Sequence, residues 1–490
     1  MKLSELLCGA PVDLGDPNID HNKSVALTLK REEISDNSLL FITSSIGRHD
    51  TPFDASELNP PPYAIIADEK KTVLNPVCPI IRASDTRAAL AYAYSNINAI
   101  DYNNLKIIGV TGTNGKTTVA SLIYGILRSA GYKVGFIGTG KISVCDQVLT
   151  EDEYSMTTPD PSLLYTSLRK MQDAGCEYAV MEVSSHSLAL NKTAPIKFEY
   201  AIFNNLSPEH MDFHKDMESY FESKLKLFQS AKRGLFNLDD SYSRRAYESV
   251  SCEKSSVGII HDGDAYITDV SLLGLSGASF YYRQSRLIFG VKSPLLGSFN
   301  VYNSLIALRC VIDLGIKPCI AKRGLEEIKS VNGRMEIIRS DITVVIDYAH
   351  TPEAFNNCLK TLFKANNKRQ KLICVFGCGG DRDKEKRRLM GKSADLYCDA
   401  VILTEDNSRT ENLHSIISDI AKGICKEYTF IESRADAIRY ALRLANVGDT
   451  VAILGKGHEK YIINSSGTNP FDEKKIVKEA LLQREIGNAN

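Results

Sequence analysis

The chain has 490 residues, of which 43% are hydrophobic and 24% are charged, and 59 Lys and Arg against 60 Asp and Glu give a formal net charge of −1. This length exceeds what one hydrophobic core usually organises, so we expect several domains. The composition is that of an ordinary globular protein, and the balanced charge gives no basis for a general attraction to nucleic acid or to acidic membranes.

Signals for export and for membrane insertion are missing from the sequence. The first residues, MKLSELLCGAPVDLGD, contain no long apolar core, and no apolar run reaches the length that spans a bilayer. The 12 cysteines are scattered and form no C-x-x-C pair, which fits reduced thiols better than disulfides or a zinc site. We therefore expect a cytoplasmic protein without membrane insertion.

The first block, residues 1–97, contains short apolar runs separated by turns. The runs SVALTL, SLLFI and YAIIAD have the length of strands, and the turns between them are rich in Pro and Asp, including NPPP at positions 59–62. We predict a separate domain from this block.

The second block, residues 98–331, alternates β-branched runs with helical patterns. The run LKIIGV precedes apolar residues that recur at i, i+3 and i+4, namely Val119, Leu122, Ile123, Ile126, Leu127 and Ala130. The runs KVGFIG, CEYAVMEV and EYAIFNNL follow. The alternation restarts in the third block, residues 332–490, with ITVVIDYAH, KLICVFGCGG, DAVILTEDN and DTVAILGKG. Such alternation predicts two α/β domains with largely parallel sheets.

A phosphate-binding loop is predicted directly after the run LKIIGV. The sequence GVTGTNGKTT ends in the second half of the pattern G-x-x-x-x-G-K-[ST], but Val110 stands where the first glycine is usual. Gly112 and Gly115 remain available for the tight curvature. Backbone N–H groups of such a turn bind phosphate together with the helix N-terminus, while Lys116 reaches the β- and γ-phosphates and Thr117 ligates Mg²⁺. We predict a nucleotide site here rather than a Gly-rich turn with an exposed lysine.

Three more residues are candidates for the same site, although their spacing alone does not single them out. Glu182 ends a predicted parallel strand, at the edge where ligands bind in open α/β sheets, and a carboxylate there can hold Mg²⁺. Taken alone, Glu182 is equally a polar strand end, His210 a loop residue and Lys224 part of a solvated helix face. A GTPase is disfavoured, because NKTA at 191–194 lacks the aspartate of the guanine-reading N-K-x-D element.

A series of motifs resembles the Mur ligase family. The segments TGTNGKTT, MEVSSHSL, NNLSPEHMDFH, GSFNVYNSLIAL, NGRMEII, DYAHTPEAF, FGCGGDRDKEKRRLMG and GKGHEKY occur in this order between about residues 107 and 460. The series is similar to the branch that adds the third residue of the peptidoglycan stem peptide. The resemblance implies three α/β domains, which are an N-terminal UDP-binding domain (1–97), a central P-loop ATPase (98–331) and a C-terminal Rossmann-like domain (332–490).

The resemblance also implies ATP-dependent amide synthesis through an acyl phosphate, with Mg²⁺ as cofactor. The residues carried over as catalytic are Lys116, Glu182, His210 and Lys224. The metal ligands implied are Thr117, Glu182, His210 and Lys224, the last of them as a carbamate. The ATP-binding residues implied are Gly112, Thr113, Asn114, Gly115, Lys116, Thr117, Thr118, Asn303, Arg334 and Asp347. Arg334 lies at the predicted hinge, so closure of two domains is expected to assemble the site.

The other substrates that the resemblance implies are small molecules, a UDP-linked muramoyl dipeptide and an amino acid, bound by a monomer. The residues carried over for the UDP-sugar-peptide are Thr157, Thr158, Ser184 and Lys192. Lys192 replaces the usual arginine and lacks its bidentate fork. The residues carried over for diaminopimelate are Arg387, Asp406, Asn407, Ser408, Arg409, Gly455 and Glu459.

The sequence DNSR at 406–409 bears on which amino acid is used. The diaminopimelate-adding branch has Asp-Asn-Pro-Arg here, whereas lysine-adding relatives lack the arginine. Arg409 can clamp the distal carboxylate of diaminopimelate in a charge-assisted pair, and Glu459 can receive its distal ammonium. Ser408 replaces a proline that would stiffen this turn.

Three hypotheses follow. The first is a ligase that adds meso-diaminopimelate to UDP-N-acetylmuramoyl-L-alanyl-D-glutamate. The second is a paralogue that joins lysine or another amino acid to a different carboxylate, because LTLKREEISDNSLLFI lacks the Asp-Ser-Arg with which the family contacts UDP. The third, a non-catalytic nucleotide-binding subunit, is disfavoured, because the full set of catalytic residues is present.

Overall fold

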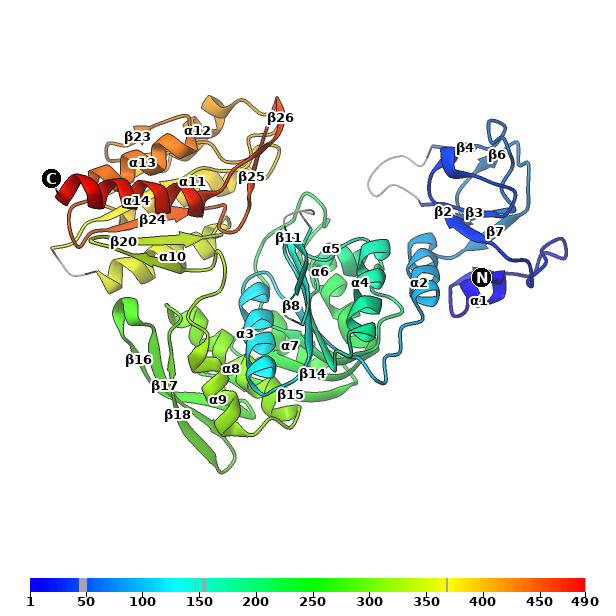
Figure 1. The fold of residues 1–490 in the computed structure, drawn as a ribbon, viewed down its shortest axis with the longest axis horizontal. Helices are drawn as coiled ribbons and strands as arrows, with labels where there is room; N and C mark the ends of the chain where they lie inside the picture. Colours follow the sequence, from blue (N-terminus) through cyan, green and yellow to red (C-terminus); the bar gives the residue numbers. More distant parts are fainter. Residues whose placement is uncertain (44–50, 146, 152–155, 367–368, 490) are drawn as a thin grey trace.

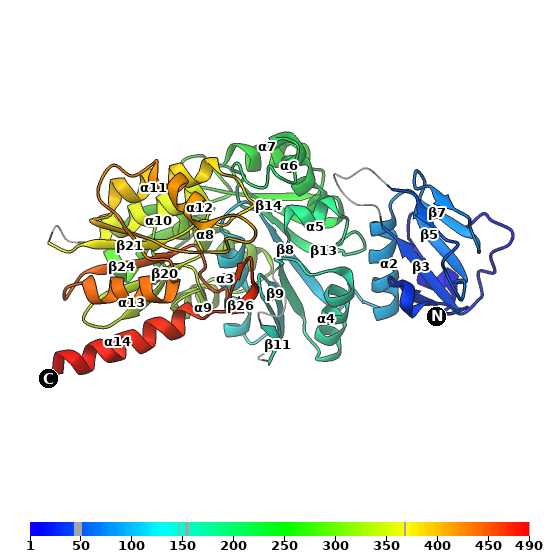
Figure 2. The ribbon, with the colours of Figure 1, turned by 90° about the horizontal axis from the view of Figure 1, so that it is seen from above.

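The computed structural model describes residues 1–43, 51–145, 147–151, 156–366 and 369–489. Three larger sheets, each with its own helices, follow one another along the described chain and form three lobes (Figure 1). The central lobe lies between the N-terminal and C-terminal lobes, and Figure 2 shows the same order from above. The α/β class predicted from the sequence is confirmed.

The N-terminal lobe is built on a five-stranded sheet with the order β1-β7-β5-β3-β2. Its elements are α1 (Leu3–Leu6), β1 (Val12–Asp13), β2 (Ala26–Thr28), β3 (Ser38–Ile42), β4 (Phe53–Asp54), β5 (Ala64–Asp68), β6 (Val73–Leu74), β7 (Ile80–Ala83) and α2 (Thr86–Asn98). Strands β2, β3, β5 and β7 pair in parallel, and β1 pairs with β7 in the antiparallel sense. The predicted runs SVALTL, SLLFI and YAIIAD contain β2, β3 and β5.

The central lobe is built on an eleven-stranded sheet with the order β11-β10-β9-β12-β8-β13-β14-β15-β16-β17-β18. Its strands are β8 (Lys106–Thr111), β9 (Val134–Gly138), β10 (Lys141–Val144), β11 (Gln147–Glu151), β12 (Tyr178–Glu182), β13 (Phe198–Phe203), β14 (Ala231–Asn237), β15 (Glu253–Gly258), β16 (Ala265–Leu272), β17 (Ala278–Gln284) and β18 (Leu287–Ser293). Its α-helices are α3 (Lys116–Ser129), α4 (Pro161–Asp173), α5 (Ser185–Ala189), α6 (Met217–Leu225), α7 (Ser241–Ser249), α8 (Ser298–Asp313) and α9 (Pro318–Glu327). The pairs from β9 to β16 are parallel, whereas β10, β11, β17 and β18 add antiparallel edges that the sequence reading did not anticipate.

Strand β8 lies between β12 and β13, and all three are buried runs. Because they are parallel, their carboxyl ends share one edge of the sheet. The predicted apolar stripe of α3 packs against the sheet, in one hydrophobic core with residues of β8, β9 and β12. Val119, Leu122, Ile123, Ile126 and Leu127 of this stripe are fully buried. Residues that follow the three strands therefore meet above the N-terminus of α3.

The C-terminal lobe has a six-stranded sheet with the order β19-β20-β24-β21-β22-β23. Its strands are β19 (Glu336–Arg339), β20 (Thr343–Asp347), β21 (Leu372–Phe376), β22 (Ala400–Leu403), β23 (Thr429–Phe430), β24 (Thr450–Leu454), β25 (Tyr461–Asn464) and β26 (Gly467–Pro470). Its helices are α10 (Pro352–Ala365), α11 (Glu385–Tyr397), α12 (Leu413–Ala421), α13 (Arg434–Leu444) and α14 (Glu473–Ala489). Strands β20 to β24 pair in parallel, and only β19 is antiparallel within this sheet.

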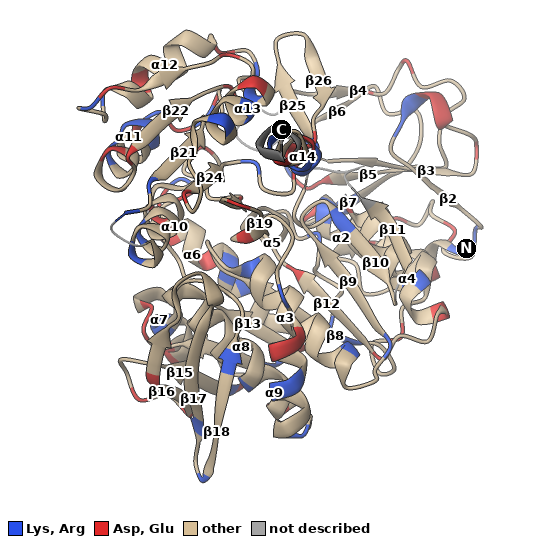
Figure 3. Ribbon diagram, turned by 60° about the vertical axis from the view of Figure 1, so that its left-hand side comes forward, with Lys and Arg blue, Asp and Glu red and all other residues tan. Residues whose placement is uncertain are grey.

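The charged residues are distributed over all three lobes. Figure 3 shows positive and negative positions intermixed along the helices and loops, in agreement with the formal net charge of −1. Within the part of the chain that is described, no helix is both long and apolar enough to cross a membrane.

Candidate active site

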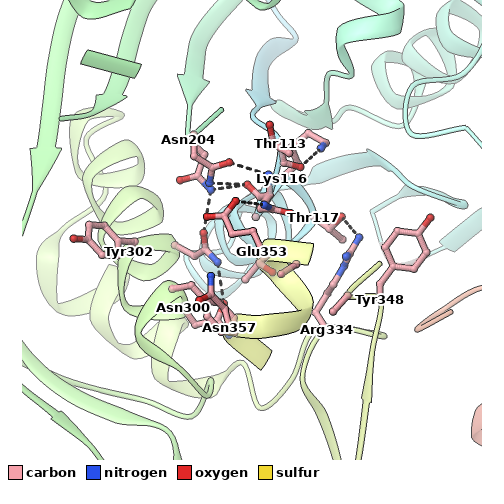
Figure 4. Close-up of a pocket in the computed structure, with 18 of the residues that line it drawn as sticks. Thr113, Lys116, Thr117, Asn204, Asn300, Tyr302, Arg334, Tyr348, Glu353 and Asn357 are labelled. Carbon is pink, nitrogen blue, oxygen red and sulfur yellow. Dashed lines mark hydrogen bonds between the residues drawn. The ribbon is translucent and has the colours of Figure 1, made fainter. Parts of the chain in front are cut away.

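A cavity of about 440 Å³ lies where the central lobe meets the C-terminal lobe. The loop after β8 and the first turn of α3 line it on one side. The segment from Arg334 to Cys358 lines the other side, so that both lobes supply walls (Figure 4). The strand order explains this position, because the carboxyl edges of both parallel sheets border the cavity.

The loop after β8 has the geometry of a phosphate site. Gly112 and Gly115 adopt φ values of +152° and +82°, and α3 begins at Lys116 directly after Gly115. A side chain at Gly115 would come within 2.6 Å of Asn303 and closer still to Asn204, so only glycine fits there. The structure thus places both predicted glycines where the turn needs them, with Val110 in the buried strand.

Lys116 folds over this loop. Its Nζ donates to the carbonyl oxygens of Gly112 (2.9 Å) and Thr113 (2.8 Å). Burial lowers the pKa of Lys116, while the charges of Glu209 and Glu182 act in the opposite direction. A half-buried ammonium beside the N-terminus of a helix is suited to neutralise the charge of bound phosphates.

Glu182 and Thr117 form an oxygen pair at the edge of the sheet. Thr117 Oγ1 donates to Glu182 Oε2 over 2.8 Å, and the backbone N–H of Thr139 donates to Glu182 Oε1 over 3.0 Å. Glu182 is completely buried at the end of β12. Arg334 Nη2 reaches across from the C-terminal lobe and donates to Thr117 Oγ1 (3.0 Å). Sequence spacing could not decide between a site residue and a polar strand end for Glu182, but the contact with Thr117 favours the site.

Lys224 is buried rather than solvated. Its side chain on α6 is 1% exposed, and Nζ donates to the Gly112 carbonyl oxygen (3.0 Å), the same atom that accepts from Lys116. Burial and the charge of Lys116 lower the pKa of Lys224 well below its usual value. Two ammonium groups on one carbonyl oxygen repel each other, so this arrangement favours an uncharged or chemically modified Lys224.

His210 lies beside the phosphate loop, in a cluster of polar side chains from both lobes. Its Nε2 is 3.5 Å from Glu209 Oε2, and the second oxygen of Glu209 is 3.1 Å from His350 Nε2 of the C-terminal lobe. Burial lowers the pKa of His210 to about 4, so its imidazole is neutral near pH 7 and keeps a lone pair for a metal ion. Burial also acts on the Glu209 carboxyl, but the hydrogen bond from His350 and the charges around it hold the Glu209 pKa below its usual range.

The remaining residues predicted for ATP also border the loop or the cavity. Asn303 on α8 accepts from Asn204 Nδ2 (3.2 Å) and donates to Asn300 Oδ1 (2.9 Å). Asp347 ends β20 and accepts from the backbone N–H groups of Met335 and Ala349, and burial raises its pKa. Thr113, Asn114 and Thr118 line the cavity within the loop and the first turn of α3.

A metal ion in this region would need ligands beyond protein carboxylates and imidazoles. Among the described residues, no group of three or more His, Cys, Asp or Glu side chains is arranged to hold a metal ion. The pair of Thr117 and Glu182 supplies oxygen atoms, which hard cations such as Mg²⁺ prefer. These residues fit Mg²⁺ when phosphate oxygens complete the coordination.

The residues predicted for the sugar-peptide lie in the segments that flank α4 and α5: Thr157 and Thr158 precede α4, and Ser184 and Lys192 stand before and after α5. Thr158 Oγ1 donates to the carbonyl oxygen of Glu182 (2.9 Å) and accepts from the Ser184 backbone N–H (3.0 Å). The Ser184 side chain caps α5 by accepting from Ser187 N. Thr157 lines the cavity, and Lys192 Nζ contacts Asp160 at 2.6 Å. Thr158 and Ser184 are therefore partly engaged in fixing the loop next to Glu182.

The residues predicted for diaminopimelate gather around a buried lysine, Lys456, which the sequence reading did not select. Its Nζ is 3.4 Å from Asp406 Oδ1, 3.1 Å from Asn407 Oδ1 and 3.0 Å from Glu459 Oε2. Glu459 also accepts from Asn407 Nδ2 (3.0 Å) and from the Tyr348 hydroxyl (3.2 Å). We name Asp406, Asn407, Lys456 and Glu459 the amine cluster.

Other predicted residues surround the amine cluster. Gly455 precedes Lys456, and a Cβ on Gly455 would come within 2.9 Å of Asp406 Oδ2. Ser408 is buried in the turn that leads to Arg409. Arg409 has a positive φ of 53°, and its Nη1 donates to the Gly380 carbonyl oxygen (2.8 Å). Among the described residues, the Arg409 guanidinium thus contacts backbone carbonyl oxygens and no carboxylate.

Arg387 is placed differently from Arg409. It is fully buried on α11, and its guanidinium donates to both oxygens of Glu411 (2.8 and 2.7 Å) and to Asp419 (3.1 Å). Both terminal nitrogens of Arg387 are already paired with carboxylates and the side chain is fully buried, so contact with an amino-acid substrate stays a prediction. Arg382 of the same segment is half exposed, and it pairs with Asp212 of the central lobe at 3.0 Å.

Sequence reasoning missed Glu209, His350, Arg382 and Lys456. All four lie inside segments that carried the resemblance, NNLSPEHMDFH, DYAHTPEAF, FGCGGDRDKEKRRLMG and GKGHEKY. The signal for Lys456 was its position between the two predicted residues Gly455 and Glu459. The contact between Glu209 and His350 joins residues 141 positions apart, which no local pattern could show.

A phosphate loop that faces a second α/β lobe across a shared cavity is typical of enzymes that use a nucleoside triphosphate between two closing domains. Comparison with known proteins identifies the family within this class of enzymes. Residues 110–311 match the Mur ligase middle domain, and residues 333–457 match the Mur ligase, glutamate ligase domain. The chain belongs to the Mur ligase family, whose members are ATP-dependent ligases.

Relatives extend the similarity over nearly the whole chain. A UDP-N-acetylmuramoyl-L-alanyl-D-glutamate--2,6-diaminopimelate ligase of Syntrophomonas wolfei is 35% identical over 494 residues, covering 98% of this chain and 99% of that protein. The ligase of the same name from Caldanaerobacter subterraneus is 37% identical over 495 residues, covering 99% and 100%. A solved structure with this name superposes with a TM-score of 0.67 at 28% identity and covers 99% of both chains.

Proposed function

We propose that the chain joins meso-diaminopimelate to the D-glutamyl carboxylate of UDP-N-acetylmuramoyl-L-alanyl-D-glutamate at the expense of ATP. The observation that carries this proposal is the cavity where Lys116, Thr117 and Glu182 of the central lobe meet Arg334 of the C-terminal lobe. The relatives that carry this enzyme name over nearly their full length support the choice of substrates.

The first chemical step is transfer of a phosphoryl group to the substrate carboxylate. A carboxylate oxygen attacks the γ-phosphorus, ADP leaves, and the carboxylate becomes an acyl phosphate with a good leaving group. Lys116 and the N–H groups of the loop offset the negative charge, and Arg334 adds a cation from the other lobe. Because Arg334 comes from the C-terminal lobe, this help is available only when the lobes are closed.

Mg²⁺ is proposed as the cofactor of this step. Thr117 and Glu182 would hold one ion next to the phosphate loop, with His210 and a carbamate on Lys224 at a second position. When bound, Mg²⁺ supplies positive charge that offsets the charge developing on the phosphoryl oxygens. A carbamate would turn Lys224 from a second ammonium on the Gly112 carbonyl into an anion, which removes the repulsion from Lys116.

The second step is attack of an amine on the acyl phosphate. The uncharged amine forms the amide bond, inorganic phosphate leaves, and the amine nitrogen releases its proton. We propose that Arg409 and the amine cluster hold the distal carboxylate and ammonium of diaminopimelate. The contact between Tyr348 and Glu459 connects this cluster to the cavity, because Tyr348 lines the cavity.

The domain limits proposed are 1–97, 98–331 and 332–490, with Thr157, Thr158, Ser184 and Lys192 at the sugar-peptide. We further propose that the enzyme acts as a monomer in the cytoplasm, the compartment that supplies ATP.

A phosphate-release assay tests the proposed function. Purified protein is mixed with ATP, MgCl₂ and the UDP-linked dipeptide, and release of phosphate is compared with diaminopimelate and with lysine as the amine. We expect turnover with diaminopimelate and much less with lysine, since lysine leaves the Arg409 guanidinium without a carboxylate. Turnover only with lysine would overturn the amine assignment. No turnover with either amine would favour the paralogue with a different carboxylate substrate.

A further inference from the structure

The cavity has two distinct ends on either side of the phosphate loop. Figure 4 shows Arg334 and Tyr348 at one end and Tyr302 at the other, with Lys116 and Thr117 between them. The end at Tyr348 leads to the amine cluster through the hydrogen bond to Glu459. A nucleotide whose phosphates lie on the loop must therefore extend its nucleoside toward Tyr302.

An exposed isoleucine stands at this second end. Ile260 lines the cavity and is 79% exposed, more than any other large apolar side chain within the described residues. A singly exposed apolar residue is ordinary on a protein surface and indicates nothing by itself. Ile260 differs because it borders a cavity and because its backbone is held in place.

The segment around Ile260 is fixed by one carboxylate, Asp239. Its oxygens accept from the backbone N–H groups of Ile259 (2.6 Å), Ile260 (3.0 Å) and His261 (2.8 Å). Tyr302 of α8 donates its hydroxyl to the same carboxylate (2.8 Å). Burial would raise the pKa of Asp239, but the three backbone hydrogen bonds and the contact with the His261 ring (2.8 Å) lower it to about 2, so the carboxylate stays charged near pH 7.

Two glycines allow the segment to turn back on itself. A Cβ at Gly258 would clash with the carbonyl oxygen of His261, and one at Gly263 would lie 2.6 Å from the backbone of Val257. The chain between them is therefore tightly folded and presents Ile260 outward from a stiff support. Because the backbone of this segment is already fixed, little backbone freedom is lost when a flat ring packs on Ile260.

We propose that Ile260 is the central-lobe contact for the purine ring of ATP, with Asp239 as the positioning residue that holds it there. This inference rests on the proposed function, because it takes the cavity as the ATP site. The contact is apolar and covers only the face of the ring, so it stabilises the base without reading its edge. The triphosphate does not touch Ile260, and this separation makes the contact testable.

The contribution of the base to binding can be distinguished from that of the phosphates by comparing two ligands. The dissociation constants of ATP and of inorganic tripolyphosphate, which has no base, are measured by calorimetry with MgCl₂ for the wild-type chain and for Ile260→Ala, Ile260→Leu and Ile288→Ala. Ile288 is the matched control, an isoleucine of β18 that is 52% exposed and does not border the cavity.

We expect Ile260→Ala to raise the dissociation constant of ATP about five-fold, because alanine lacks the carbon atoms of the isoleucine side chain that the purine ring would partly cover. Tripolyphosphate binding should not change, Ile260→Leu should remain close to wild type, and Ile288→Ala should affect neither ligand. Asp239→Asn should weaken ATP in the same selective way, because the amide replaces an acceptor of the backbone hydrogen bonds.

Three results would overturn the inference. They are an unchanged affinity of Ile260→Ala for ATP, an equal loss for ATP and tripolyphosphate, and the same loss in Ile288→Ala. The wild-type measurement separates this failure from failure of the proposed function. If the wild-type chain bound neither ATP nor tripolyphosphate, the ATP site itself would be wrong and Ile260 with it.

Discussion

The nucleotide cavity and the amine cluster use buried charge in opposite ways. At the phosphate loop that borders the cavity, Lys116 and Lys224 both donate to one carbonyl oxygen, and Arg334 Nε is buried without a partner among the described residues. In the amine cluster, Lys456 contacts two carboxylates and an amide, and Glu459 accepts from three donors.

The difference reflects the charge of the ligands expected in the two places. A triphosphate brings several negative charges, so the protein can leave cations unmatched around an open space. Diaminopimelate carries both signs, and groups that bind it can pair with each other when it is absent. The amine must therefore exchange ion pairs that the protein already makes, whereas the nucleotide brings negative charge to cations that now donate to uncharged oxygens.

The largest effect is expected from removing the cation of the phosphate loop. Lys116→Ala should lower kcat by roughly 1,000-fold or more, because it removes the ammonium of the phosphate loop itself and leaves Arg334 of the other lobe to offset the phosphoryl charge without it. Phosphate release under saturating substrates measures it, with Lys232→Ala as control, since Lys232 is exposed and pairs with Glu199. Near-normal turnover of a folded Lys116→Ala protein would remove the phosphate-loop assignment.

Lys224→Ala should lower kcat by about 100-fold, if its carbamate takes part in holding the second Mg²⁺. Short carboxylic acids added to the assay should restore part of the activity by filling the space of the carbamate. The matched control is Lys254→Ala, because Lys254 also lies over a tyrosine ring but on the surface. Full activity in Lys224→Ala would contradict a role in the site.

Lys456→Met tests whether the amine cluster balances its own charge. Without the ammonium, Asp406 and Glu459 lose their buried partner, and we expect the free energy of unfolding to fall by about 3 kcal/mol. Urea unfolding measures it, and Lys422→Met, which removes an exposed partner of Asp419, should change little. Equal stability of Lys456→Met and wild type would show that the cluster does not depend on this charge.

Arg387→Ala should act on stability more than on amine binding. Its guanidinium already holds Glu411 and Asp419, so we expect a loss of roughly 2–3 kcal/mol in unfolding free energy, the range for charged hydrogen bonds. The KM for diaminopimelate should change little in the folded fraction. A large rise in KM without loss of stability would instead support the substrate contact predicted from the sequence.

Arg409→Ala should act on the amine alone. Loss of a charge-assisted hydrogen bond, worth roughly 1.5–3 kcal/mol, should raise the KM for diaminopimelate by one to two decades with little effect on the KM for ATP. Discrimination against lysine should shrink by a similar factor. Arg439→Ala is the control, because Arg439 pairs with Asp436 on the surface of α13. Unchanged amine selectivity in Arg409→Ala would contradict the diaminopimelate assignment.

Local patterns predicted the secondary structure around the site well. The run LKIIGV became β8, the apolar stripe from Val119 became the buried face of α3, and the four runs of the third block became β20, β21, β22 and β24. The antiparallel strands β10, β11, β17 and β18 were missed, because edge strands follow from pairing with a neighbour rather than from a continuous buried run.

The sequence by itself determined the phosphate loop, the parallel α/β lobes and the family. Each of these rests on short-range features, such as glycines that permit a turn, apolar periodicity and motif order, that are complete within a few residues. Only the tertiary structure decided that Lys224 is buried against Gly112, that Lys456 holds the amine cluster together, that Arg387 is paired with Glu411 and that Ile260 borders the cavity. Burial and charge pairing depend on which distant segments the fold brings together. A local sequence pattern does not show which residues far apart in the chain come into contact.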